Sequence, residues 1–385
     1  MIALLILGLA PLVIWSGLLA AHGGFWRASE RDDRDQPPAP AAWPSVVAVV
    51  PARDEADVIA RSVGSLLAQD YPGPFQVILV DDQSSDGTAD IARAEAERLG
   101  RSDRLEIIAG QPLPAGWTGK LWAMSQGIAR ARAIRAPKYL WLTDADIGHA
   151  PDNLRALAAR AEAGRLTLTS LMAELHCRTL AERFLIPAFV FFFQMLFPFA
   201  RVNGPGRTAA AAGGCMLARS DALSAGGGVD AIRSALIDDC AMGALMKAQG
   251  PVWLGLTHRS ISLRPYQTVA EVGRMISRSA YAQLDYSPIK LIGVVVGMSL
   301  VYVAPVAAVL FGGTAVKIMG MAAWLMMALS FQPMLRFYRR SPLWGLALPA
   351  IAAAYTLFTI QSAVQTWRGR GGLWKGRAQA MASAR

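Results

Sequence analysis

The chain has 385 residues, 54% of them hydrophobic, and its mean hydropathy of +0.32 is high for a purely soluble protein. Its net charge of +10 does not indicate nucleic-acid binding, because the basic residues form no single stripe interleaved with aromatics and no nucleic-acid motif is present. The three cysteines, Cys177, Cys215 and Cys240, are too few and too irregularly spaced for a disulfide framework or a zinc site. The composition predicts one soluble domain combined with a membrane portion.

The first element is an uncharged run over residues 2–21, from which we predict a transmembrane anchor over residues 1–22. No positive segment precedes it, which argues against a cleaved signal peptide. The arginines that follow indicate an anchor with its amino end outside and the next residues at the cytoplasmic face. Residues 23–44 are charged and rich in proline, and we expect them to form a linker.

From residue 45 to about residue 264, strand-like and helix-like segments alternate. Apolar runs predict strands at 46–50, 76–80, 105–108 and 139–143. Helical patterns cover about 55–69, a segment that opens near Gly87, and the sequence KLWAMSQGIARARA. This order implies a parallel sheet with crossover helices.

An apolar run over residues 184–200 lies within this region and contains Pro187 and Pro198. It is short for a membrane span, so we expect a helix that lies at the bilayer surface, with a span as the alternative.

Three further apolar runs occupy residues 291–316, 318–335 and 341–366, and they predict a membrane domain over 286–366 with two or three transmembrane helices. A basic tail follows over 367–385. Three spans after a cytoplasmic domain would put this tail outside, against the positive-inside rule, unless one run is re-entrant. We favour a cytoplasmic tail.

Three acidic pairs stand just after or beside apolar runs. They are Asp81 with Asp82, Asp144 with Asp146, and Asp238 with Asp239. Clustered carboxylates repel one another and persist mainly where a metal ion or a polar ligand offsets the repulsion. The first two pairs follow runs of strand length, so we expect them at the carboxyl edge of the sheet, where open α/β folds bind ligands.

The two carboxylates of Asp144 and Asp146 can share one hard divalent cation, Mg or Mn, whose other ligands are diphosphate oxygens and water. His149 is a possible further ligand, although a solvated loop histidine is the favoured interpretation. Asp81, Asp82 and Asp86 also have a simpler interpretation, as caps of the following helix.

The segments PARDEADVIARSVGSLLAQDYP, VDDQSSDGT, GWTGK, DAD and the Asp238–Asp239 pair occur in an order that resembles the family 2 glycosyltransferases, over roughly residues 45–285. This resemblance implies an α/β fold, a GT-A nucleotide-binding domain with a mostly parallel sheet, flanked here by transmembrane helices. The segments LPAGWTGKLWA, AYAQLDYSP and WKGR further resemble the hopanoid-associated membrane glycosyltransferases and, more distantly, ceramide glucosyltransferase-like enzymes.

The resemblance implies which residues bind a nucleotide sugar. Asp81 or, preferably, Asp82 would contact uracil, and Glu55 matches the glutamate of the family's Pro-x-x-Asn-Glu, with Asp54 in place of the asparagine. Lys120 would contact phosphate, unless it is only a lysine at a helix start. Gly213 and Gly214 would let the backbone approach the donor sugar.

Asp146 would bind the metal directly, and Asp144 would touch the ribose or a metal-bound water. In the last pair Asp239 would be the general base, whereas Asp238 replaces the family's glutamate and would support it. The favourable dipole at a helix amino terminus is compatible with that role.

Processive synthases of the family carry Gln-x-x-Arg-Trp after the base. Here Arg278 matches the arginine and would face the acceptor or diphosphate, but Met275 and Ser279 occupy the other two positions. A single transfer is therefore favoured over processive synthesis.

Together these features predict a membrane-anchored inverting glycosyltransferase that moves one sugar from a nucleotide sugar, preferably a UDP-sugar, to a lipid acceptor, with a role in hopanoid-related metabolism implied by the resemblance alone. We expect a multi-pass protein of the bacterial inner membrane with a cytoplasmic catalytic domain. The alternatives are a processive polysaccharide synthase and a nucleotide-binding membrane scaffold without turnover.

Overall fold

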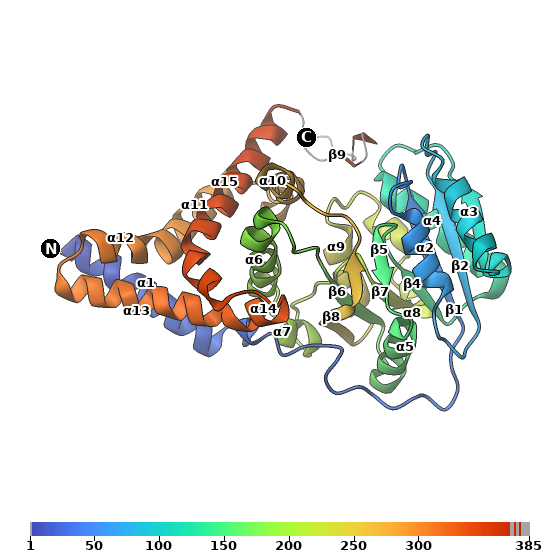
Figure 1. Ribbon diagram of the computed structural model, residues 1–385, viewed down its shortest axis with the longest axis horizontal. Helices are drawn as coiled ribbons and strands as arrows, with labels where there is room; N and C mark the ends of the chain where they lie inside the picture. The colour runs from blue at the N-terminus through green and yellow to red at the C-terminus, as the bar shows by residue number, and fades with distance from the viewer. Residues whose placement is uncertain (1, 370–372, 375–376, 379–385) are drawn as a thin grey trace. The chain divides into compact units, whose positions relative to one another are not determined.

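The structure is a computed structural model that describes residues 2–369, 373–374 and 377–378. The chain divides into two compact units (Figure 1). Of the described residues, an α/β unit comprises 30–176, 201–265, 373–374 and 377–378, and a helical unit comprises 2–29, 177–200 and 266–369. The predicted basic tail over 367–385 lies mainly outside the described residues.

The α/β unit is built on an eight-stranded sheet in the order β3-β2-β1-β4-β7-β6-β8-β5. The strands are β1 (Val46–Ala52), β2 (Phe75–Asp81), β3 (Leu105–Ala109), β4 (Tyr139–Leu142), β5 (Ile147–His149), β6 (Leu168–Glu174), β7 (Met216–Arg219) and β8 (Val252–Ser262). The first four strands are mutually parallel, as is the pair β6–β8, whereas β7 runs antiparallel to both β4 and β6, and β5 antiparallel to β8. The predicted strands and the mostly parallel sheet are confirmed.

Helices cover both faces of this sheet. They are α2 (Ile59–Leu67), α3 (Thr88–Arg98), α4 (Gly119–Arg135), α5 (Asn153–Gly164), α8 (Ser220–Ala225) and α9 (Asp238–Lys247), with short 3₁₀ turns η2 (Ser102–Arg104) and η3 (Val229–Ile232). The helix expected from residue 55 begins only at Ile59, because Glu55 turns the chain there: its N–H bonds the Thr88 hydroxyl and its carbonyl accepts from Val58. A two-residue pair, β9 (Leu373–Trp374) with β10 (Arg377–Ala378), follows at the end.

The core of this unit explains why its central strands show no polar alternation. Every residue of β1 is buried, as expected for a strand covered on both faces. One face of the sheet packs against side chains of α2, α3 and α5, and α4 packs across β1 and β2 on the other. The apolar core is therefore a three-layer sandwich that holds the carboxyl ends of the parallel strands in fixed positions.

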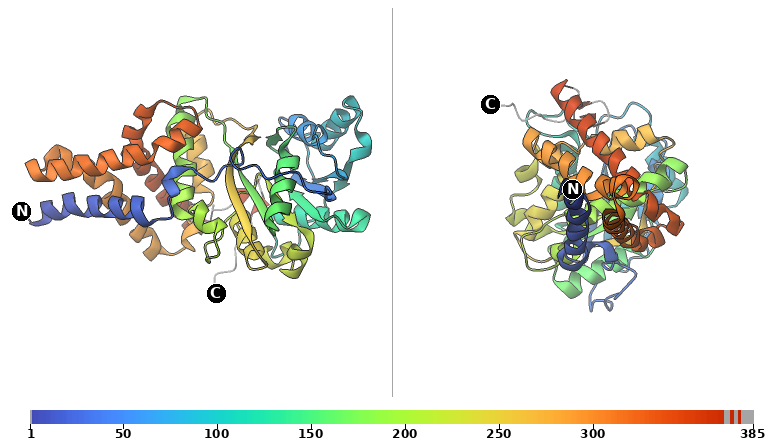
Figure 2. Two further views of the ribbon diagram at one scale, coloured as in Figure 1. Left: turned by 90° about the horizontal axis from the view of Figure 1, so that it is seen from below. Right: turned by 90° about the vertical axis from the view of Figure 1, so that its left-hand side faces the viewer.

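The helical unit contains α1 (Ile2–Ala21), η1 (Phe25–Arg27), α6 (Leu180–Leu196), α10 (Val269–Ser277), η4 (Ala282–Leu284), α11 (Pro288–Met298), the π-helical turn η5 (Ser299–Val303), α12 (Ala304–Phe311), α13 (Thr314–Ser330), α14 (Gln332–Phe337), η6 (Pro342–Ala347) and α15 (Leu348–Trp367). The short α7 (Phe199–Asn203) lies where the chain leaves this unit. Helix α1 runs alongside α12 and α13 (Figure 2), and the Trp15 indole donates to the carbonyl of Val301 at 3.0 Å.

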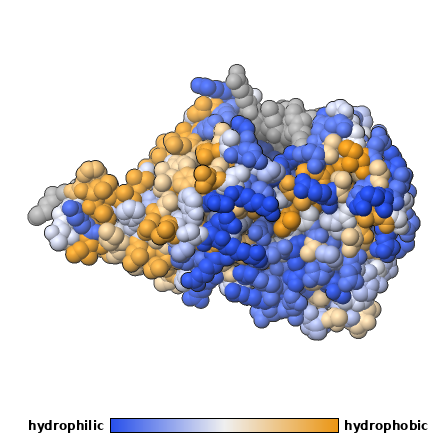
Figure 3. Space-filling view, viewed as in Figure 1, coloured by the Kyte–Doolittle hydropathy of each residue, from blue (hydrophilic) through white to orange (hydrophobic). Residues whose placement is uncertain are grey.

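Three stretches are long and apolar enough to cross a membrane, namely Pro288–Phe311, Thr314–Phe337 and Pro342–Trp367. Apolar side chains dominate the surface over α12 and α13 (Figure 3). The predicted run over 291–316 was wrong at its end, because the first helix stops at Phe311 before Gly312–Gly313 and Lys317 lies inside the next helix. The π-turn ends two residues before Pro305, which has no N–H to donate to the preceding turn.

The apolar run at 184–200 forms most of α6, which begins earlier, at Leu180, behind a capping box made by Thr179 and Glu182. Pro198 lies between α6 and α7. Helix α6 packs against α10, α14 and α15, and the Tyr355 hydroxyl donates to its Leu185 carbonyl at 2.9 Å. Its position at a bilayer surface stays a prediction.

The contact of α4 with the sheet yields a stability test. An added Cβ on Gly127 would overlap Val49 and lie 2.9 Å from Val80 Cγ2, and β-branched valines in a sheet have little freedom to move away. We expect Gly127→Ala to destabilise the protein by about 1–3 kcal/mol through overpacking. Thermal unfolding of the full chain in detergent measures this.

The matched control is Gly206→Ala, because a methyl group there would meet no described atom within 4 Å. An unfolding temperature of Gly127→Ala equal to those of the control and the wild type would contradict the tight packing of α4 on β1 and β2.

Candidate active site

The strand order creates a meeting point for several loops at one edge of the sheet. The chain builds β1, β2 and β3 outward and then returns to place β4 on the other side of β1. The loops after β1 and β4 therefore diverge, leaving a crevice at the carboxyl ends of the strands, which is where open α/β sheets bind ligands. Asp81 ends β2 and Asp144 follows β4, so both stand at this edge as the sequence predicted.

Lys120 joins three of the predicted motifs. It is the second residue of α4, and its Nζ lies 2.7 Å from Asp144 Oδ1 and 2.9 Å from Asp238 Oδ2. Burial lowers the pKa of Lys120, but the charges of Asp144 and Asp238 outweigh it and raise that pKa above its ordinary value. Lys120 is therefore a permanent cation between carboxylates from two different elements.

A backbone hydrogen bond and the start of helix α9 bring Lys120 and Asp238 together. The N–H of Thr118, directly before α4, donates to the carbonyl of Arg233 at 2.9 Å, which ties the start of α4 to the segment that leads into α9. Helix α9 begins at Asp238, so Asp238 and Asp239 occupy its first turn, where the helix dipole favours negative charge.

Asp239 is held by main-chain donors. Its Oδ2 accepts from the Gly213 N–H at 3.2 Å and its Oδ1 from the Cys240 N–H at 2.7 Å. Burial, followed by the charge of Asp238, raises the pKa of Asp239 to about 6, against the opposing effect of Lys120. Burial and the charges of Asp146 and Asp238 likewise raise the pKa of Asp144. A carboxylate with its pKa near 6 is suited to accept a proton at neutral pH.

Gly213 and Gly214 lie close to Lys120 and Asp144 because the antiparallel strand β7 follows them. Leu142, the last residue of β4, pairs with Met216, the first of β7, so the residues before β7 stand beside Asp144. The Thr143 hydroxyl donates to the Gly214 carbonyl at 2.8 Å, and a Cβ on Gly213 would lie 3.3 Å from Lys120 Nζ. Gly213 thus permits the close approach of backbone to Lys120 and Asp239.

The turn after β2 holds the other predicted donor residues. Asp82 is fully buried, while Asp81 is half-buried and accepts from the Ser84 N–H. Arg53 donates to the Asp82 carbonyl, and Asp54, at φ 50°, accepts from the Ser85 N–H. Of the two neighbouring carboxylates, Asp81 is the more accessible to a ligand, although the sequence favoured Asp82.

The sequence analysis missed Arg264, which follows β8. Its guanidinium contacts Glu55 and lies 3.4 Å from Asp57 Oδ2 and 3.5 Å from Asp146 Oδ2. The only signal in the sequence is a basic residue after a strand-like run, which is too common to be selected. Arg264 links the predicted donor residue Glu55 to the predicted metal ligand Asp146.

Both interpretations of His149 were wrong. His149 is buried in β5, where burial lowers its pKa to about 3. Its Nε2 lies 2.9 Å from the Thr143 hydroxyl and its Nδ1 3.0 Å from the Ser260 hydroxyl. Both ring nitrogens are thus engaged in the protein interior, and His149 is a structural core residue rather than a loop histidine or a metal ligand.

Among the described residues, no three His, Cys, Asp or Glu side chains form a group that could hold a metal ion. Asp144 and Asp146 provide two carboxylates close enough that the charge of Asp146 affects Asp144. Oxygen donors of this kind suit Mg²⁺ or Mn²⁺ when a diphosphate and water supply the remaining ligands. The donor set therefore fits a cation shared with a phosphate-bearing ligand.

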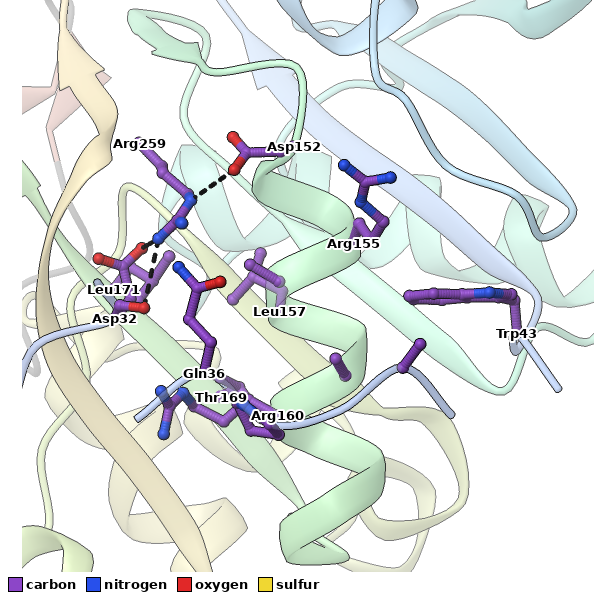
Figure 4. A pocket seen from close by; sticks show the side chains of 14 residues that line it. Asp32, Gln36, Trp43, Asp152, Arg155, Leu157, Arg160, Thr169, Leu171 and Arg259 are labelled. Atoms are coloured by element: carbon purple, nitrogen blue, oxygen red, sulfur yellow. Dashed lines mark hydrogen bonds and ion pairs between the residues drawn. The ribbon is translucent and has the colours of Figure 1, made fainter. Parts of the chain in front are cut away.

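Arg278 is exposed and directly follows α10 in the helical unit, so its predicted role stays a prediction. A cavity of about 330 Å³ lies elsewhere in the α/β unit, between the segment 32–43 and α5 (Figure 4). Arg259 crosses it and pairs with Asp32 and Asp152. None of the predicted site residues lines this cavity, and we do not assign it to catalysis.

Comparison with protein-family models matches residues 47–227 to "Glycosyl transferase family 2". The match runs from β1 through β7, so this part of the chain is similar to the family 2 glycosyltransferases. A comparison with curated proteins found no significant match.

Among solved structures, the mannosyltransferase PcManGT from Pyrobaculum calidifontis, in complex with GDP-Man and Mn²⁺, is similar over 94% of this chain and 99% of that chain, with a TM-score of 0.55 and 17% identity. TarS 1-349 from S. aureus, in complex with UDP-GlcNAc, aligns over 88% and 97% with a TM-score of 0.38 and 13% identity. Glucosyl-3-phosphoglycerate synthase from Mycobacterium tuberculosis aligns over 63% and 79% with a TM-score of 0.40 and 15% identity. The first of these supports the GT-A fold, and the other two carry no further argument.

The cluster around Lys120 yields a pH-dependent stability test. We expect Lys120→Met to destabilise the protein by about 2 kcal/mol at pH 8 and by clearly less at pH 5. The variant leaves the carboxylates without their cation, and their folded-state pKa values, already raised for Asp144 and Asp239, rise further. Because a raised carboxylate pKa removes stability as pH rises through it, the loss is greatest above pH 6.

Unfolding temperatures at both pH values, for the full chain in detergent, measure this difference. Lys138→Met is the control, because Lys138 forms an exposed pair with Glu162, at 2.7 Å, and should matter little at either pH. Equal losses for Lys120→Met at pH 5 and pH 8 would show that the carboxylates do not depend on its charge.

Proposed function

We propose that this chain, whose residues 47–227 match glycosyltransferase family 2, is a membrane-anchored inverting glycosyltransferase that moves one sugar from a nucleotide sugar to a hydroxyl group of a membrane lipid. The observation that supports this most is the joining of Lys120, Asp144, Asp238 and Asp239 at the crevice of the sheet, with Gly213 against Asp239. These groups supply the charges that binding a diphosphate and accepting a proton require.

The donor would lie along the carboxyl edge of the sheet. The Asp81 carboxylate, at the end of β2, would accept a hydrogen bond from the N–H of a base such as uracil, and Glu55 would support the neighbouring loop through Arg264. The Lys120 ammonium group, beside Asp144, would bind the diphosphate through its positive charge. Gly213 and Gly214 would let the backbone approach the donor sugar, as the resemblance implies.

Asp239 would act as the general base. Its carboxylate takes the proton of the acceptor hydroxyl while the acceptor oxygen forms a bond to the anomeric carbon. The bond from that carbon to the phosphate oxygen breaks, and its electron pair leaves with the nucleoside diphosphate. One in-line displacement inverts the anomeric centre, and the Gly213 and Cys240 N–H groups hold the base in position.

Asp144 and Asp146 would hold the divalent cation, and when bound it supplies Lewis-acid stabilisation of the negative charge on the departing diphosphate. The similar mannosyltransferase was solved with GDP-Man and Mn²⁺, in keeping with this proposal. With the leaving group stabilised in this way, the site needs no second carboxylic acid, which fits the assignment of a single base.

The helical unit supports a lipid acceptor. Its three candidate spans carry exposed apolar side chains that a soluble protein would bury, including Ile289, Ile292 and Phe311. A protein held in the bilayer meets lipid hydroxyls at high local concentration. A hopanoid or related polyisoprenoid is the acceptor that the sequence resemblance favours.

The overall activity has a direct test. Purified full-length protein, given a panel of nucleotide sugars with and without membrane lipids, should release nucleoside diphosphate only when donor and lipid are both present. Excess chelator or Asp146→Ala should abolish release, because the cation offsets the charge of the diphosphate. Turnover that persists in chelator would contradict the metal requirement, and nucleotide binding without turnover would favour a scaffold.

The base assignment has its own test. Asp239→Asn keeps the size of the side chain but cannot take the proton, so transfer should fall by about 10²–10⁴ while nucleotide binding survives. Wild-type turnover should rise with pH through about 6, because the base must be ionised and the pKa of Asp239 is raised to that value.

Asp238→Asn is the matched control, since it removes the adjacent carboxylate and should cost less activity. The two carboxylates interact, so the pH profile reports the pair rather than one group. Unchanged turnover in folded Asp239→Asn would refute the base assignment.

A further inference from the structure

The register of the last strand pair fixes the position of Arg264. Ile147 of β5 pairs with Ser262 of β8, and the N–H of Leu263 donates to the Asp146 carbonyl at 2.8 Å. The backbone pairing alone therefore places Arg264 beside the turn that contains Asp144 and Asp146. Pro265 follows at once and ends the strand ladder.

The Arg264 guanidinium is surrounded by acidic groups. It contacts Glu55, whose side chain is 10% exposed, and it also faces Asp57 and Asp146. Burial lowers the pKa of Arg264, but these three carboxylates outweigh it, so the side chain stays charged. The contact with Asp146 is the longest of the three, with 3.5 Å between Nε and Oδ2, and both side chains there are about one-third exposed.

We propose that Arg264 is a positioning residue that serves as a built-in counter-cation for Asp146, so that the divalent cation binds weakly alone and more tightly together with the nucleotide sugar. This inference rests on the proposed function. Arg264 already supplies positive charge at Asp146, and Lys120 does so at Asp144. A cation that arrives without a diphosphate meets a protein cation already placed beside each of the two carboxylates that would bind it.

A diphosphate changes that balance. It brings negative charge to the same edge of the sheet. The divalent cation, Lys120 and Arg264 can then all contact phosphate oxygens and no longer compete for the carboxylates of Asp144 and Asp146. The long Asp146 contact can open while Arg264 keeps its contacts with Glu55 and Asp57. Metal-free protein would thus keep Asp146 in place without a permanently bound metal.

The test measures Mn²⁺ binding to full-length protein in detergent, by the electron paramagnetic resonance signal of free Mn²⁺, with and without UDP or GDP. Without nucleotide, Arg264→Met should bind Mn²⁺ about three- to tenfold more tightly than wild type, because the competing charge is gone. Arg264→Lys, which keeps a positive charge, should return the affinity toward the wild-type value. The gain from nucleotide should be smaller in Arg264→Met than in wild type.

Arg61→Met is the matched control. Arg61 is exposed and donates to the Leu263 carbonyl at 3.4 Å, so its loss removes a nearby charge without breaking an ion pair to Asp146. Its Mn²⁺ affinity should match that of wild type, and Asp146→Ala should abolish binding in every background.

An equal, weaker or undetectable Mn²⁺ affinity in Arg264→Met overturns the proposal, and equal tightening in Arg61→Met does so too, since it would reveal only a general charge effect. These outcomes leave the proposed function to its own transfer assay. Conversely, Arg264→Met could bind Mn²⁺ more tightly in a protein that transfers no sugar. That result would support the competition between Arg264 and Mn²⁺ for Asp146 and would refute only the proposed glycosyltransferase activity.

Discussion

The site depends on a single positive charge in the middle of several negative ones. Lys120 lies between Asp144 and Asp238, with Asp239 next to the latter, and these carboxylates come from elements far apart in the chain. Without a cation among them, their repulsion would drive the elements apart or force protonation. The same charge makes the cluster suitable for an anionic ligand, since a diphosphate can replace one protein carboxylate as the partner of Lys120.

A second cation repeats this arrangement on the other side of the Asp-x-Asp turn, where Arg264 joins Asp146 to Glu55. Each acidic residue of the turn thus faces its own cation. These cations offset the repulsion that acidic residues would otherwise meet at a strand end.

The antiparallel strands have a role that the parallel half of the sheet cannot fill. Because β7 starts where β4 ends, it puts Gly213 beside Asp239 and Lys120. Because β8 ends where β5 begins, it puts Arg264 beside Asp146. The parallel strands create the crevice, and the mixed half of the sheet brings residues from late in the chain back to it.

The sequence by itself determined the elements and which acidic residues stand at the sheet edge, because strand-length apolar runs, turns and ordered acidic motifs are local patterns. It predicted the parallel strands, the long apolar helices and the acidic residues at the sheet edge. Only the tertiary structure decided that Lys120 joins Asp144 to Asp238 and that Arg264 belongs to the site, because ion pairs between distant segments leave no local pattern. The same reason explains His149: its partner Ser260 is brought to it by β8, so its burial followed from strand pairing that its neighbours in sequence do not encode.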